Sequence, residues 1–85
     1  MAEITVLVRY FAAARAAAGT TEEKLSPTSA ELSALVSAMV DSHGPDLARV
    51  LLRCSYLVDE VAAHGPATVL RDGATVDVLP PFAGG

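Results

Sequence analysis

The residues whose types and spacing best suit covalent chemistry lie at the C-terminal end, which reads Pro80-Pro81-Phe82-Ala83-Gly84-Gly85. Proline lacks an amide hydrogen and favours extended backbone before it, so two prolines would end a strand and direct the chain outward. Two glycines could thread a narrow channel and leave both faces of the Gly85 carbonyl accessible. Six extended residues reach roughly 20 Å, which is enough to enter the active site of another protein.

The expected chemistry of this end is acyl transfer from the Gly85 carboxylate. A free α-carboxyl group has a pKa of about 3.5, so it is ionised at pH 7 and acylates poorly. Activation as an acyl-adenylate with ATP would let a sulfur nucleophile displace AMP and leave a thiocarboxylate. The competing interpretation is an ordinary glycine-rich chain end with no chemistry of its own.

Other reactive side chains give weaker signals. The single cysteine, Cys54, cannot form an intramolecular disulfide and is predicted to be a small buried hydrophobic residue. His43 and His64 are far apart in the sequence, and a zinc site needs four ligands, so we expect no metal site. Asp59 and Glu60 are predicted to form a solvated turn.

Composition narrows the classes of function. The 85 residues carry a net charge of −4 and no basic stripe, which argues against nucleic-acid binding. Apolar runs are too short to cross a bilayer, and no signal peptide is recognisable. Together with the single cysteine, these features predict a cytoplasmic protein with no membrane partner.

The first part of the sequence predicts a strand at residues 4–11, a short helix at 12–18 ended by Gly19, and a second strand at 22–25. Alternation in the first strand places one set of apolar residues toward the core: Ile4, Val6, Val8 and Tyr10. Leu7 and Phe11 then lie on the outer face, where apolar residues indicate a partner surface.

The principal helix is predicted to follow. Thr28 and Glu31 match a capping box, in which Thr28 is the N-cap and Glu31 reaches back to it. One apolar stripe of helical period continues from there: Leu32, Leu35, Val36, Met39 and Val40. The run His43-Gly44-Pro45 ends the helix, and a shorter helix is expected at 46–52.

Strands are expected again at 55–58 and 75–79, with a tight turn at Asp72-Gly73 before the last one. This order predicts a two-layer α+β domain, with the helix across one sheet face and the first and last strands as parallel neighbours. We therefore expect one domain at residues 1–79 and a flexible tail at 80–85.

Two segments carry a family resemblance. Tyr10-Phe11-Ala12-Ala13-Ala14-Arg15-Ala16-Ala17-Ala18-Gly19 follows an aromatic-Phe-Ala-x-x-Arg-(x)3-Gly pattern, and residues 70–85 follow Leu-x-Asp-Gly-x-x-Val-x-(apolar)2-Pro-Pro-x-x-Gly-Gly. Both resemble the molybdopterin synthase small subunit, the MoaD branch of the MoaD/ThiS family. A third segment, Tyr56-Leu57-Val58-Asp59, matches the family's middle strand loosely, with Asp59 where asparagine is common. One position departs from the pattern: Ala16 stands where the family often has an acidic residue.

The resemblance implies a ubiquitin-like β-grasp fold, with a mixed sheet of four to five strands and one principal helix. It implies an E1-like, ATP-dependent adenylyltransferase that activates Gly85, and a synthase large subunit that receives the tail. Gly85 would then donate sulfur to cyclic pyranopterin monophosphate, within a heterotetramer holding two copies of this subunit. By position, four residues would dock on partners: Phe11, Arg15, Leu79 and Phe82. The chain itself would bind no cofactor and would not be catalytic alone, because ATP is used by the activating partner.

Two further classes of function stay open. A sister sulfur carrier for thiamine or cysteine biosynthesis would use the same tail with another acceptor. A ubiquitin-like protein tag or a plain interaction module is the other alternative, although Lys24 is the only lysine available for building chains.

Overall fold

A single mixed sheet forms one layer of the molecule. The structure is a computed structural model and describes residues 3–81. Within that range five strands pair in the order β2-β1-β5-β3-β4. In chain order they are β1 (Val6–Tyr10), β2 (Glu22–Leu25), β3 (Ser55–Val58), β4 (Val61–Ala62) and β5 (Thr75–Leu79).

The first and last strands are parallel neighbours at the centre of the sheet, as predicted. Leu7 is in register with Thr75, and Tyr10 with Val78. The other pairs, β1 with β2, β3 with β5 and β3 with β4, are antiparallel. A parallel pair needs a crossover connection, and the helical segment between β1 and β5 provides it.

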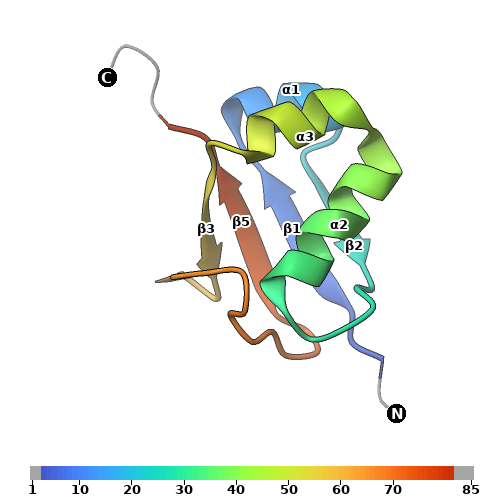
Figure 1. The fold of residues 1–85 in the computed structure, drawn as a ribbon, viewed down its shortest axis with the longest axis vertical. Helices are drawn as coiled ribbons and strands as arrows, with labels where there is room; N and C mark the ends of the chain where they lie inside the picture. The colour runs from blue at the N-terminus through green and yellow to red at the C-terminus, as the bar shows by residue number, and fades with distance from the viewer. Residues whose placement is uncertain (1–2, 82–85) are drawn as a thin grey trace.

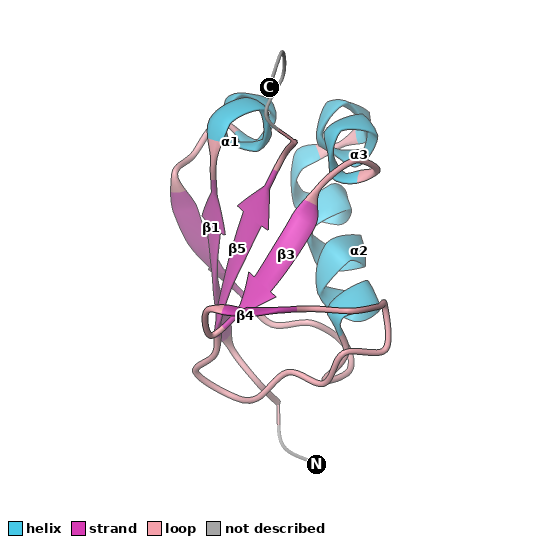
Figure 2. Ribbon diagram, turned by 90° about the vertical axis from the view of Figure 1, so that its left-hand side faces the viewer, coloured by secondary structure: helices cyan, strands magenta, loops and turns pink. Residues whose placement is uncertain are grey.

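Three helices accompany the sheet in the described part of the chain: α1 (Ala12–Ala18), α2 (Leu32–His43) and α3 (Pro45–Leu51). Figure 2 shows α2 and α3 covering one face of the sheet, while none of the helices within residues 3–81 covers the opposite face. The strands, the covering helix and the parallel central pair form the ubiquitin-like β-grasp fold, so the expected fold class is correct.

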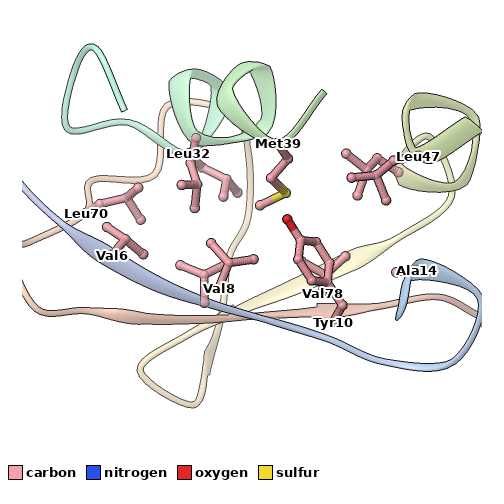
Figure 3. Packing of buried hydrophobic residues seen from close by; sticks show 12 residues of the cluster. Val6, Val8, Tyr10, Ala14, Leu32, Met39, Leu47, Leu70 and Val78 are labelled. Carbon is pink, nitrogen blue, oxygen red and sulfur yellow. The ribbon is translucent and has the colours of Figure 1, made fainter. Parts of the chain in front are cut away.

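The core lies between α2 and the covered sheet face (Figure 3). Val6, Val8 and Tyr10 of β1 are buried, which confirms the alternation expected for this strand. From α2 the stripe contributes the buried residues Leu32, Leu35 and Met39, while Val36 and Val40 are partly buried against the cluster. Burying one such aliphatic side chain favours folding by about 1.5–3 kcal/mol, so this stripe holds α2 on the sheet.

One polar group reaches the edge of the core. The Tyr10 hydroxyl donates a hydrogen bond to the Glu23 carboxylate at 2.6 Å, and His43 Nε2 lies 2.5 Å from the same oxygen. Burial, followed by the hydrogen bond to Glu23, raises the pKa of Tyr10 well above its ordinary value of 10. The contact ties β1, β2 and the end of α2 together.

The predicted capping box of α2 is wrong. Helix α2 begins at Leu32, Glu31 is itself the N-cap residue with extended backbone, and no side chain caps the helix. Backbone carbonyls replace the capping side chain: Leu32 N donates to Thr68 O and Ser33 N to Pro66 O, both at 2.9 Å. The first-turn amides therefore have partners, and the sequence pattern at Thr28 has no capping role.

The predicted turns are correct. Gly19 ends α1 in the left-handed conformation, and its amide donates to Arg15 O at 2.9 Å. Gly73 has φ of +84°, and Ala74 N donates to Arg71 O at 3.0 Å across the turn. Strand β5 ends at Leu79, immediately before the predicted tail at 80–85, although the division into a domain and a flexible tail stays a prediction.

Helices within residues 3–81 fall short of the length and apolar character that crossing a bilayer requires.

Candidate functional site

The point where the chain leaves the sheet is the end of β5. Leu79, the last residue of the strand, is in register with Ser55 at the start of β3. On the other side, Phe11 N donates to Val78 O at 3.3 Å, so the end of β1 lies beside the same exit. The candidate tail residues Phe82, Ala83, Gly84 and Gly85 lie outside the described residues.

Phe11 and Leu79 are brought to the same end of the sheet. Phe11 has 38% of its surface exposed, and Leu79 is partly exposed. Because residues in register on neighbouring strands share a face, Arg9, Asp77 and Leu57 all belong to the uncovered face. Leu79 follows Asp77 by two positions and therefore shares that face with it. Exposed apolar side chains on an uncovered sheet face are suited to contact with another protein.

The third predicted docking residue in the described range, Arg15, is exposed on α1. Its backbone amide donates to Phe11 O at 3.4 Å, so the two residues are one helical turn apart. Among the described residues the Arg15 guanidinium makes no hydrogen bond or ion pair. It therefore remains accessible to a partner beside Phe11.

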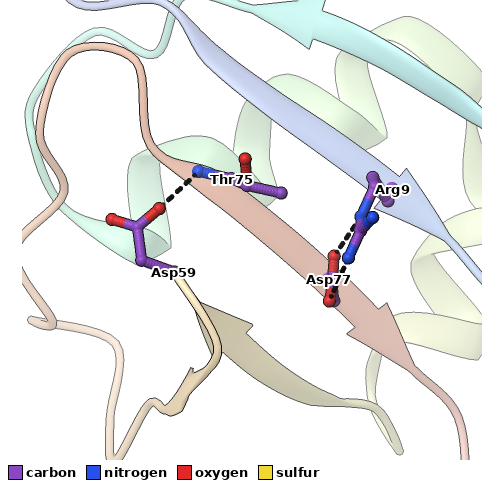
Figure 4. Close-up of polar contacts among 4 residues, drawn as sticks. All are labelled: Arg9, Asp59, Thr75 and Asp77. Atoms are coloured by element: carbon purple, nitrogen blue, oxygen red, sulfur yellow. Dashed lines mark hydrogen bonds and ion pairs between the residues drawn. The ribbon is translucent and has the colours of Figure 1, made fainter.

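Sequence analysis did not identify the ion pair at the centre of the uncovered face. Arg9 Nε donates to Asp77 Oδ1 at 2.6 Å, and its terminal nitrogen donates to Oδ2 at 2.8 Å (Figure 4). The hydrogen bond to Asp77 raises the pKa of Arg9 above its ordinary value, so the guanidinium stays charged. The available signal was a pair of opposite charges, Arg9 and Asp77, at outward positions of two strands, β1 and β5, that were predicted to be parallel neighbours.

A shallow hollow of about 270 Å³ lies next to this ion pair and is lined by Arg9, Asp59, Glu60, Thr75 and Asp77. Asp59 Oδ1 accepts a hydrogen bond from Thr75 N at 2.9 Å, and both Asp77 oxygens accept from Arg9 (Figure 4). Carboxylates engaged in this way are poor general bases. The Asp59 and Asp77 carboxylates are therefore already engaged within the domain.

Cys54 does not have the properties of a nucleophile. Burial raises the pKa of its thiol, which keeps the sulfur protonated at neutral pH. The sulfur contacts Val50 O at 3.3 Å, one helical turn back. In the part of the chain that the structure describes, no three His, Cys, Asp or Glu side chains gather in a way that could hold a metal ion.

Solved structures of several small proteins share this fold. Small archaeal modifier protein 1 from Methanosarcina acetivorans is 25% identical, with a TM-score of 0.84 and 100% of both chains covered. The putative molybdopterin converting factor subunit 1 from Pyrococcus furiosus is 24% identical, with a TM-score of 0.76 over 93% of this chain and 99% of that one.

A third structure contains a complex. In the protein–protein complex of subunits 1 and 2 of the molybdopterin-converting factor from Helicobacter pylori, the matching chain is 26% identical, with a TM-score of 0.66 over 96% of this chain and 100% of that one. Among curated proteins, no sequence matches this chain. The model of the ThiS family matches residues 8–85, which include β-strands β2 to β5, all three helices and the glycine pair. The chain therefore belongs to the ThiS family.

Proposed function

We propose that this protein is a sulfur carrier that works through the Gly85 carboxylate, and that it serves molybdenum cofactor biosynthesis as the small subunit of a molybdopterin synthase. The carrier role is supported by membership of the ThiS family over residues 8–85. The two prolines that follow β5 suit a tail that reaches away from the domain. In this role the folded domain presents a docking face, and the reaction takes place at the tail within partner proteins.

The observation that carries the proposal is that the chain leaves β5 beside two exposed apolar side chains. Leu79 ends the strand, Phe11 lies beside it through the contact with Val78 O, and the proline pair follows at once. A partner that covers Phe11 and Leu79 would meet the tail as it leaves the sheet. Binding of the domain would then deliver Gly85 to a partner's active site.

The proposed loading reaction has two balanced steps. A carboxylate oxygen of Gly85 attacks the α-phosphorus of ATP, and pyrophosphate leaves. Hydrosulfide then attacks the carbonyl carbon of the acyl-adenylate, the bond to the AMP oxygen breaks, and the sulfur proton passes to water. One carboxylate oxygen departs with AMP, so the product is a thiocarboxylate. ATP and its catalytic residues belong to the activating partner in this scheme.

The test is the intact mass of the protein after incubation with the adenylyltransferase of the same organism, ATP and a sulfide source. Replacement of one oxygen by sulfur adds about 16 Da to the acyl group. A variant lacking Gly85 and a reaction without ATP are the controls, and neither should gain mass. An unchanged wild-type mass would contradict the proposal, provided that the same enzyme preparation adenylates another carrier protein in a parallel reaction.

The choice of the molybdopterin branch is supported by the family pattern at Tyr10–Gly19 and by the likeness to subunit 1 of the Helicobacter pylori complex. The expected acceptor is a synthase large subunit that converts cyclic pyranopterin monophosphate within a heterotetramer. An affinity purification with the tail intact tests this choice. Recovery of a thiazole synthase or a cysteine synthase in place of the large subunit would assign the carrier to thiamine or cysteine biosynthesis.

A ubiquitin-like tag is the second candidate, and its support is the likeness to small archaeal modifier protein 1. A tag begins with the same activated glycine but ends as an amide on a lysine of its target. Isopeptide-linked adducts at Gly85 in cell extract, with no thiocarboxylate, would favour this function over sulfur transfer.

A further inference from the structure

Arg9 makes a second contact on the uncovered sheet face besides its ion pair with Asp77. The central carbon of its guanidinium lies over the Phe11 ring, 5.8 Å from the ring centre. A cation within about 6 Å of the face of an aromatic ring is attracted by the quadrupole of that ring. Arg9 therefore connects Asp77, a largely covered residue of β5, to Phe11, the exposed aromatic residue beside the chain exit.

The backbone of Phe11 is fixed independently of Arg9. Phe11 has extended backbone that continues β1, so its side chain lies on the same face as that of Arg9. Its amide donates to Val78 O, and its carbonyl accepts from the amide of Ala14 at 3.0 Å. The next residue, Ala12, has φ of +51°, a left-handed conformation at the sharp turn from β1 into α1. These contacts place the backbone, and Arg9 lies where it can set the orientation of the ring.

Asp77 sets the orientation of the Arg9 guanidinium. Figure 4 shows both Asp77 oxygens facing Arg9, which donates to them at 2.6 Å and 2.8 Å. Two parallel hydrogen bonds fix the plane of a guanidinium as well as its position. Glu22 of β2 is in register with Arg9 on the other side, but no hydrogen bond joins their side chains within residues 3–81. The β5 carboxylate, and not that of β2, therefore holds Arg9 in place.

We propose that Arg9 is a positioning residue for docking: held by Asp77, it orders the ring of Phe11 on the uncovered face before a partner arrives. The inference rests on the proposed function, in which the synthase large subunit covers Phe11, and deepens it. A side chain that is ordered in advance loses less conformational entropy when an interface buries it, so the complex is tighter. Asp77 acts in the same direction, but only through Arg9.

The first measurement needs no partner. The chain has two phenylalanines, Phe11 and Phe82, so full-length protein labelled with 4-fluorophenylalanine gives two fluorine signals, which a Phe82→Leu variant assigns. The transverse relaxation rate of the Phe11 fluorine reports how mobile the ring is. Arg9→Leu should lower this rate toward its value in the urea-unfolded protein. Arg9→Lys, which keeps a cation without the bidentate geometry, should give an intermediate rate.

Asp77→Asn tests whether the carboxylate acts through Arg9. The substitution keeps Arg9 but turns one accepting oxygen into a donor, so it should also lower the relaxation rate at Phe11. Glu22→Gln is the matched control, because it removes the same charge on the other side of Arg9 and breaks no hydrogen bond to the guanidinium. It should leave the rate unchanged. Arg9→Leu/Asp77→Asn should give the rate of Arg9→Leu alone.

The second measurement is the Kd of the full-length carrier for the synthase large subunit, obtained by calorimetric titration. Arg9→Leu should raise the Kd about threefold, which corresponds to the loss of one exposed cation–π contact. In a Phe11→Ala background the same substitution should leave the Kd unchanged, because Arg9 acts through the ring. Thermal unfolding establishes that each variant is folded at the temperature of both measurements.

A Phe11 relaxation rate that Arg9→Leu leaves unchanged, or that Glu22→Gln lowers as much as Asp77→Asn does, would overturn the inference. An equal rise in Kd from Arg9→Leu with and without Phe11 would also overturn it, because Arg9 would then contact the partner itself. Absence of binding by the wild type would instead contradict the proposed acceptor, and the docking role of Arg9 with it. The fluorine data on the free protein distinguish the two failures.

Discussion

Arg9 and Asp77 form a bidentate ion pair across the parallel strands β1 and β5, with distances of 2.6 Å and 2.8 Å. The two residues are in register, so the pair joins the strand that leads to Phe11 with the strand that leads to the tail. The Asp77 side chain is only 9% exposed, whereas that of Arg9 is 41% exposed. The ion pair therefore stabilises the alignment that places Phe11 beside the chain exit.

Removing Arg9 should destabilise the protein because it leaves the Asp77 carboxylate covered and unpaired. We expect Arg9→Leu to lower the free energy of unfolding, by less than breaking a fully buried pair would, because Arg9 is partly solvated. Replacing both residues in Arg9→Leu/Asp77→Leu should recover most of that loss. Urea unfolding at pH 7 measures the three free energies, and a double variant as unstable as Arg9→Leu would refute this explanation.

The β3–β4 turn holds two non-glycine residues in the left-handed conformation, Asp59 at φ +50° and Glu60 at φ +71°. Asp59 also accepts the Thr75 amide, but no such bond is present for Glu60 among the described residues. Glu60→Gly should therefore raise the free energy of unfolding by about 0.5–1 kcal/mol through relief of backbone strain.

Glu60→Ala is the matched control for the turn, since alanine keeps the β-carbon that causes the strain. It should change the free energy of unfolding by only a few tenths of a kcal/mol. If alanine stabilises the protein as much as glycine does, the gain comes from removing the glutamate charge and not from the backbone.

Tyr56 should make the protein less stable at alkaline pH. Burial, with a smaller effect from Cys54, raises its pKa to about 12. In the unfolded chain a tyrosine has a pKa of about 10, so above that pH the unfolded state loses a proton that the folded state retains. Stability should fall by about 2 kcal/mol between pH 10 and 12 on this account.

Denaturant unfolding at pH 8, 10 and 11 checks the alkaline effect, with Tyr56→Phe as the control. Tyr56→Phe loses only a long contact, 3.5 Å from the hydroxyl to Leu51 O, so its free energy of unfolding should fall less steeply as the pH rises. Tyr10 contributes in the same direction, so some decline should remain. Identical slopes for the variant and the wild type would exclude Tyr56 as the source.

Phe11 should contribute to binding the synthase large subunit without being essential for folding. We expect Phe11→Ala to raise the Kd about tenfold, because exposed aromatic residues often dominate such interfaces. Leu52→Ala is the control, since Leu52 is 86% exposed and lies after α3, away from the uncovered sheet face. Calorimetric titration that gives the same Kd for both variants would exclude Phe11 from the interface.

Much of the fold could be predicted from local pattern. Alternation in β1, the apolar stripe of α2 and the glycines at the turns each encode a local geometry that the structure confirms. The α2 cap was mistaken because its amides are satisfied by carbonyls of residues 66 and 68, more than thirty positions away in the chain. The sequence around Thr28 cannot indicate these carbonyl partners, because only the folded chain brings residues 66 and 68 near the start of the helix.

The site was predictable in part. Phe11, Arg15 and Leu79 were named from the family pattern, and the structure brings them to the end of the sheet from which the chain exits. The Arg9–Asp77 pair required a register between strands that are 68 positions apart.

The central claim is that sulfur is carried on the carboxyl group of Gly85, and fragment-ion mapping of the loaded protein tests it most directly. After reaction with the adenylyltransferase, ATP and sulfide, we predict a gain of about 16 Da on the C-terminal fragment alone. An unchanged mass of the C-terminal fragment, in a reaction in which the carrier is needed for AMP to form, would contradict the account.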